Sequence, residues 1–242
     1  INTDHEYWGK YDAKVRDCAA ALNLLGMTQI RPLLLAILER FDGTQVLKAF
    51  EKLEAVAVRF QIVGGVGGGT LEKIYSETAK SVSEGKLTTA SDIIKAFTTL
   101  PVDSAFEQAF AVASISKQNL ARYYLRNLEE GIVSTAECEM VPSQDTTRVN
   151  LEHVLPLTLG EDWQDKWMAD DARAFQRRLG NLALMSAKIN SVVGNDGFSA
   201  KKGAYKKSSF YFTKMLSRFE RWDKGAIEER QKEMAKIAVK VW

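Results

Sequence analysis

Cysteine and histidine are scarce in this chain, and their scarcity restricts its chemistry. The only two cysteines, Cys18 and Cys138, stand far apart among 242 residues. Such a pair cannot supply a four-ligand zinc site or a framework of disulfides, and we expect both to be reduced thiols. Of the two histidines, His5 lies in a polar N-terminal stretch that we expect to be frayed rather than metal-binding. Only His153 is left as a candidate for histidine chemistry.

Long apolar runs and nucleotide-binding loops are missing as well. No run of about 18 apolar residues occurs, so the sequence offers no membrane-spanning helix, and its first residues are too polar for a signal peptide. The glycine-rich stretch from Gly64, GGVGGGT, matches neither a dinucleotide-binding pattern nor a P-loop. We expect that stretch to connect two helices. We also expect the protein to be cytoplasmic and the chain, which begins at Ile1 rather than Met, to be a fragment.

What the sequence does contain is a globular composition with unevenly distributed charge. Apolar residues make up 45% of the chain, which is enough to bury a core. From Ala172 onward there are 16 Lys and Arg against 6 Asp and Glu, a net charge of +10, and the remainder has 17 against 25, a net charge of −8. A polyanion such as DNA would therefore bind the C-terminal part.

The first half of the chain has the spacing of helices. From Asp12 to about Glu130, apolar residues recur three and four positions apart between Gly, Pro and capping residues, which predicts five or six helices. The clearest cover residues 31–41, 46–63, 71–82, 91–100, 104–115 and 117–131. An irregular stretch begins at Ser134, and we place a domain boundary there. The sequence thus predicts a helical scaffold over residues 1–140 and a second domain over 141–242.

The pattern changes after that stretch. Residues from Arg148 alternate as in a strand that Pro156 ends. Residues 178–185, RLGNLALM, could form the second arm of a small hairpin, and a short helix follows that Gly194 would stop. The last residues, 208–242, are expected to be mostly amphipathic helix. The fold class expected for the whole chain is mainly α.

Three polar residues of this second part can converge. His153 stands in Glu-His-Val-Leu-Pro at a strand end, Asn181 in a Gly-Asn turn, and Asn190 on the short helix. Taken singly, the histidine could be an ordinary hydrogen-bonded strand residue and Asn190 a helix-surface amide. Asn195, in Gly-Asn-Asp-Gly, is more typical of a turn that ends a helix, so we keep it as a reserve ligand.

This arrangement resembles the HNH, or ββα-metal, nuclease family. The wider string of L-E-H-V-L-P, R-L-G-N-L-A-L, K-I-N-S and G-N-D-G-F resembles the C-terminal nuclease domain of GmrSD-type, modification-dependent restriction proteins, which also occurs in phosphorothioate-linked phage defence. The resemblance covers roughly residues 149–242, and residues 31–131 look like the helical region that precedes this domain. It implies a small ββα-metal core embedded in C-terminal helices. It also implies an N-terminal nucleotide-hydrolysing sensor domain as a partner, which this sequence does not contain.

The resemblance also implies roles for individual residues. His153 would be the general base that activates water, and Asn190 would offer its side-chain oxygen to Mg²⁺ or Mn²⁺. Asn181 would hold the loop and His153 in register. Glu152, directly before the histidine, would be the second metal ligand. Side chains alternate along a strand, so this last assignment requires a local bend.

Basic residues around this core would contact DNA phosphates; they are Arg177, Arg178, Lys188, Lys201, Lys202, Lys206 and Lys207. The function that we expect is that of a metal-dependent DNA endonuclease or nickase, the effector of a bacterial anti-phage restriction system. The alternative is a non-catalytic DNA-binding domain with a degenerate nuclease fold. An all-helical interaction module, and RNA as the substrate, also remain open.

Overall fold

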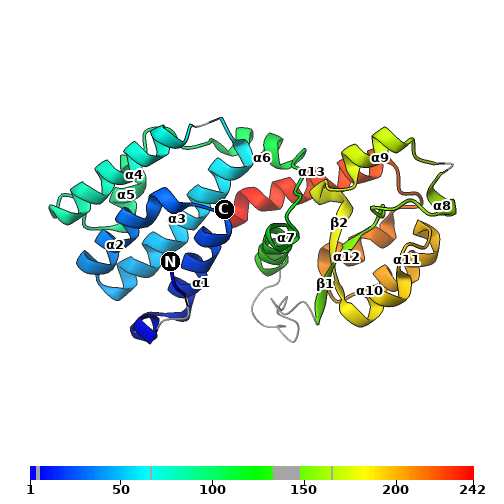
Figure 1. Ribbon diagram of the computed structural model, residues 1–242, viewed down its shortest axis with the longest axis horizontal. Coiled ribbons are helices and arrows are strands. Elements are labelled where there is room, and N and C mark those ends of the chain that lie inside the picture. The colour runs from blue at the N-terminus through cyan, green and yellow to red at the C-terminus, as the bar shows by residue number, and fades with distance from the viewer. Residues whose placement is uncertain (4–5, 66, 133–147, 165) are drawn as a thin grey trace. The chain divides into compact units, whose positions relative to one another are not determined.

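The chain divides into two compact units, which consist of residues 1–106 with Trp242 and of residues 107–241. The computed structural model describes residues 1–3, 6–65, 67–132, 148–164 and 166–242 (Figure 1). In this described part the chain is mainly helical with one two-stranded sheet, as expected. The boundary that we placed at residue 140 lies outside the described residues. The division into compact units falls between residues 106 and 107, before helix α7, Gln118–Ile132.

The first unit is a set of helices that begin and end where the sequence indicates. They are η1 (Glu6–Lys10), α1 (Ala13–Leu24), η2 (Thr28–Ile30), α2 (Arg31–Arg40), α3 (Gly43–Val63), α4 (Gly68–Ser83) and α5 (Ala90–Ala96), and α6 (Asp103–Phe110) follows them. Asp42 caps α3 by accepting the Gln45 N–H, and Thr89 and Asp92 form a capping box on α5. The helices predicted in this region are confirmed, but α5 ends at Ala96 rather than at residue 100, and α6 ends at Phe110 rather than at residue 115.

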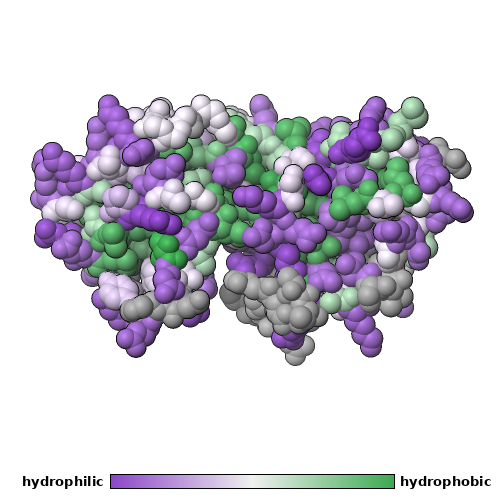
Figure 2. All heavy atoms as spheres, viewed as in Figure 1, coloured by the Kyte–Doolittle hydropathy of each residue, from purple (hydrophilic) through white to green (hydrophobic). Residues whose placement is uncertain are grey.

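The glycine-rich stretch connects two helices, as predicted. Helix α3 ends at Val63, and Gly64 and Gly65 follow with φ of 67° and 81°, a backbone conformation that favours glycine. Helix α4 starts at Gly68. Pairs α1 and α3, α2 and α4, and α3 and α5 pack against each other. None of the described helices is long and apolar enough to cross a bilayer, and hydrophilic residues dominate the face drawn in Figure 2.

The second unit surrounds a small antiparallel sheet. After α7 its elements are β1 (Val149–His153), α8 (Glu161–Gln164), α9 (Ala169–Phe175), η3 (Leu179–Asn181), β2 (Leu182–Ser186), α10 (Ala187–Val193), α11 (Phe198–Lys206), α12 (Tyr211–Met215), η4 (Leu216–Arg218) and α13 (Lys224–Val241). The register runs from Val149 opposite Ser186 to His153 opposite Leu182. The two expected strands and the short helix after them are therefore confirmed. Two helices, α8 and α9, lie in the connection between the strands, where we had predicted none.

Helices enclose the sheet, and this explains the composition of β2. Helix α10 contacts both strands, and α7 and α12 also contact β2. Residues 182–185 of β2 are all buried, so the strand reads as a continuous apolar run rather than an alternating one. The C-terminal segment is not one long helix, because residues 219–223 separate η4 from α13. The segment is nevertheless mostly helical, as expected.

Glycine at position 180 allows the turn before β2 to lie against α13. A Cβ atom there would collide with the carbonyl oxygen of Ile227 and with the Gln231 side chain. From the same helix, the fully buried Arg230 donates to the carbonyls of Gly180 at 2.6 Å and of Leu182 at 3.0 Å. Helix α13 thereby sets the position of the turn that contains Asn181.

Candidate active site

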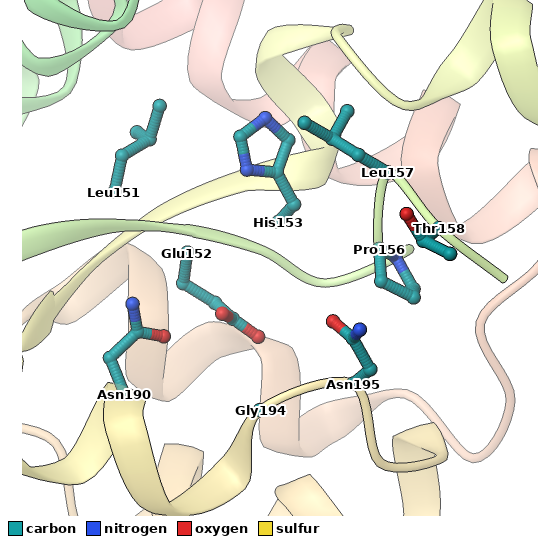
Figure 3. Close-up of a pocket in the computed structure, with 9 residues that line it drawn as sticks. All are labelled: Leu151, Glu152, His153, Pro156, Leu157, Thr158, Asn190, Gly194 and Asn195. Carbon is teal, nitrogen blue, oxygen red and sulfur yellow. The ribbon is translucent and has the colours of Figure 1, made fainter. Parts of the chain in front are cut away.

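A cavity of about 270 Å³ lies along β1 and the turn after it. Its lining includes Glu152 and His153 from β1, Leu157 from the turn, Asn190 from α10 and Asn195 from the turn that follows α10 (Figure 3). Three of the residues predicted from the sequence therefore share one cavity, and the reserve candidate Asn195 joins them. Asn181, the fourth predicted residue, is not part of the lining.

The two residues predicted as general base and metal ligand lie on opposite faces of β1. Figure 3 shows the His153 ring on one side of the strand and the Glu152 carboxylate on the other side, toward Asn190 and Asn195. This is the alternation that an extended strand imposes, so the local bend that we required between them is not found. Both residues nevertheless line the cavity.

His153 is partly buried, and its surroundings favour the neutral imidazole. Burial lowers its pKa below the usual 6.5, and the positive charges of Arg177 and Lys201 lower it further. At neutral pH the ring is therefore largely unprotonated and has a nitrogen available to accept a proton. The lowered pKa also places Arg177, an exposed residue, within electrostatic reach of the histidine.

Asn181 is fully buried and holds the chain just after His153. Its Oδ1 accepts the Leu155 N–H at 2.8 Å, and its Nδ2 donates to the Leu155 carbonyl at 3.0 Å. Its own backbone carbonyl accepts the Val154 N–H at 3.0 Å. The side chain also donates to the Gln176 carbonyl at 2.9 Å. With every polar group satisfied, Asn181 makes the backbone after His153 rigid.

Two residues that the sequence analysis missed complete this support. Trp222 donates its indole N–H to Asn181 Oδ1 at 2.9 Å, and the Gln176 amide donates to the carbonyls of Pro156 and Leu157 at 2.7 and 3.0 Å. Both side chains are buried. No spacing in the sequence indicates these contacts. The only hint is that a buried tryptophan usually finds a partner for its N–H.

Glu152 is bound by two residues of α11. Its Oε1 accepts from the Lys201 ammonium at 2.8 Å and from the Tyr205 hydroxyl at 2.9 Å. Burial raises the pKa of the carboxyl, while Lys201 and Tyr205 oppose that rise. Lys201 has no exposed surface. Our assignment of Lys201 to a surface that contacts phosphates is thus corrected, because its charge is used inside the unit.

The other basic residues differ in their exposure. Arg177, Lys188, Lys206 and Lys207 are exposed, and Lys202 is half-buried. Arg178 donates to Gln231 Oε1 at 2.8 Å and to the Ala111 carbonyl at 2.9 Å, so its guanidinium is engaged in contacts within the unit.

Glu152, Asn190 and Asn195 bring oxygen donors to one side of the cavity. A carboxylate and amide oxygens suit Mg²⁺ or Mn²⁺, which can complete their shell with water and phosphate oxygens. Within the described residues there is no group of three or more His, Cys, Asp and Glu that could hold a metal ion. The oxygen donors are thus of the kind that a hard cation prefers, but among Glu152, Asn190 and Asn195 only Glu152 carries a negative charge.

Comparison with known proteins identifies a relationship for the second unit. The model of one family, described as GmrSD restriction endonucleases, C-terminal domain, matches residues 100–237. This match covers more than half of the chain and contains every residue of the candidate site, and it confirms the resemblance seen in the sequence. It begins well before residue 149, so it also includes α7. No curated protein matches the chain.

Proposed function

The chain belongs to the family of GmrSD restriction endonuclease C-terminal domains, and from this membership and the site geometry we propose that its second unit is a metal-dependent DNA endonuclease or nickase of the HNH type. In this proposal it is the effector of a bacterial anti-phage restriction system. It acts in the cytoplasm and works with a nucleotide-hydrolysing sensor domain. His153 is the general base, and Glu152 and Asn190 hold Mg²⁺ or Mn²⁺.

The observation that carries the proposal is the position of His153 relative to Glu152. The two side chains lie on opposite faces of β1, and both residues line one cavity. In a direct displacement at phosphorus, the attacking water and the leaving oxygen stand on opposite sides of the phosphate. A phosphate across this cavity would have a base on one side and the oxygen donors on the other.

The residues then have distinct tasks. The neutral His153 ring accepts a proton from water, and the water oxygen bonds to phosphorus while the bond to the leaving oxygen breaks. The leaving oxygen takes a proton from solvent. A divalent cation at Glu152 and Asn190 would supply positive charge that stabilises the phosphate oxygens. Asn181 keeps the backbone after His153 in place, and Arg177 is a candidate phosphate contact beside the base.

A plasmid assay tests the proposal. Supercoiled DNA is incubated with the full chain and Mg²⁺, Mn²⁺ or EDTA, and nicked and linear products are measured. We expect cleavage that requires the cation and that His153→Ala reduces about 100-fold or more. His5→Ala, which removes the other histidine, is the matched control and should retain full activity. Equal cleavage by both variants would show that His153 is not the base.

The second candidate, a non-catalytic DNA-binding domain, is favoured by one observation. The ammonium of Lys201 already neutralises Glu152, as in a site where a fixed cation has replaced a metal. A gel-shift assay distinguishes the two functions. DNA binding by wild type and His153→Ala alike, with no cleavage by either protein at any cation concentration, would support the binding domain.

A further inference from the structure

We infer that Lys201 makes cation binding depend on DNA, so that the site takes up its divalent cation together with the phosphate to be cut. The inference rests on the proposed function and adds a regulatory property to the same site. Lys201 acts through Glu152 and is therefore a positioning residue rather than a catalytic one.

The geometry of the ion pair is the first argument. Both charged side chains are withdrawn from water, with 0% of the Lys201 side chain and 5% of the Glu152 side chain exposed. Lys201 and Tyr205 both donate to Oε1, and neither of these bonds uses Oε2. Two donors on one oxygen fix the carboxylate in a single orientation. The carboxylate is therefore held in place without a bound cation.

The charge of the site is the second argument. The pair of Glu152 and Lys201 has no net charge, and the amide side chains of Asn190 and Asn195 are neutral. Arg177 adds positive charge nearby. A divalent cation that approaches Glu152 meets the ammonium 2.8 Å from the same carboxylate, in surroundings where charges interact more strongly than in water.

DNA changes this balance. Its phosphates bring negative charge to a cavity that has no net negative charge of its own. A cation bound between Glu152 and a phosphate is then stabilised by both the carboxylate and the phosphate. Linkage then requires the effect to be mutual, because each ligand raises the affinity of the other by the same factor. Lys201 lowers the cation affinity of the site, so that at a limiting cation concentration the site fills only when the phosphates of DNA add their attraction.

The experiment measures Mn²⁺ binding rather than cleavage. The His153→Ala variant of the whole 242-residue chain is titrated with Mn²⁺ and followed by electron paramagnetic resonance, with and without a short DNA duplex. The Mn²⁺ bound by the duplex alone is subtracted. We expect the duplex to raise the Mn²⁺ affinity of the protein about tenfold or more. Adding Lys201→Gln should raise the Mn²⁺ affinity of the DNA-free protein by a similar factor, so that the site fills without DNA. Adding Glu152→Gln should remove the binding.

Each outcome decides the matter. Equal Mn²⁺ affinity with and without DNA in the first titration overturns the inference. Because that titration leaves Lys201 unchanged, its result holds even if Lys201→Gln does not fold. Unchanged DNA-free affinity in a folded Lys201→Gln variant also overturns it. A Lys201→Gln variant that folds only with Mn²⁺ supports it. The cleavage assay separates this inference from the proposed function. If wild type cleaves DNA with Mn²⁺ and His153→Ala does not, an unchanged Mn²⁺ affinity rejects only the coupling to DNA. If wild type shows no cation-dependent cleavage, the nuclease function is rejected.

Discussion

The two units of the chain bury very different side chains. Among the described residues of the first unit, Thr78 is the one buried residue of polar type, and its hydroxyl donates to the Ile74 carbonyl of its own helix. In the described part of the second unit eight polar or charged residues are buried, which are Glu129, Glu152, Gln176, Asn181, Lys201, Thr213, Arg230 and Gln231. Their hydrogen bonds reach other elements over long stretches of sequence. The first unit is held by shape and apolar area, whereas the second uses buried polar contacts to hold its loops.

This difference corresponds to the difference in function that we propose. A core of apolar side chains tolerates substitutions that keep volume. A buried hydrogen bond, in contrast, fixes one arrangement and is costly to leave half-made. The strands described in the second unit are only five residues long, so side chains such as Asn181 and Arg230 help to position His153 and Asn190. Substitutions in the two units should therefore have unequal effects.

The largest difference is expected for Arg230. Arg230→Met leaves the carbonyls of Gly180, Leu182 and Phe212 without this donor, and we expect the free energy of unfolding to fall by about 3–5 kcal/mol. In the first unit Phe50→Leu, at an equally buried position, should cost about 1 kcal/mol. Urea unfolding followed by circular dichroism measures both. Equal losses would remove the contrast between the two cores.

Asn181 comes next. Asn181→Leu leaves both polar groups of the Leu155 backbone and the Trp222 indole unsatisfied, and we expect a loss of about 3 kcal/mol. Cleavage should fall about 100-fold, since displacement of a supporting residue moves the base. Thr78→Val, the matched change in the first unit, should cost less than about 1 kcal/mol and leave cleavage as it is. Full cleavage by folded Asn181→Leu would contradict the positioning role.

Glu129 should make stability depend on pH. It accepts the N–H groups of Tyr211 and Phe212 at 2.7 and 2.8 Å, and burial raises its pKa to about 7. Between its unfolded and folded pKa values the folded chain holds a proton that the unfolded chain has lost, so stability falls as pH rises. From pH of about 5 to about 6.5 we expect a loss of about 2 kcal/mol. Glu129→Gln should flatten this dependence in urea titrations, and an unchanged slope would contradict it.

The smallest effect concerns Arg177. Cleavage by wild type should rise with pH and level off above a midpoint below 6.5, because burial and nearby positive charge lower the pKa of His153. Arg177→Met should move that midpoint upward by less than about one unit. Lys48→Met in the first unit is the control and should leave it in place. Single-turnover rates from pH of about 5 to about 8 provide the test, and a downward shift would exclude the proposed electrostatic contact.

The secondary structure could largely be predicted because its signals are local. Apolar spacing and caps such as Asp42 identified the helices of the first unit, and alternation with a following proline identified β1. Helices α8, α9 and α11 were not predicted. They are short, and α8 and α9 lie in the segment that connects β1 to β2. The pairing of the two strands was expected as a small hairpin, whereas short helices in a connecting segment give only a weak periodic pattern.

The sequence by itself determined the family, the order of strand, strand and helix, and the concentration of basic residues near the C-terminus. These properties belong to residue types and short spacings. Only the tertiary structure decided that Lys201 is buried against Glu152, 49 positions away, and that Asn195 joins Asn190 in one cavity. It also decided that His153 and Glu152 face opposite sides of β1. The reason is physical: the burial and charge balance of a side chain depend on which distant elements pack around it, and that is set by the fold as a whole.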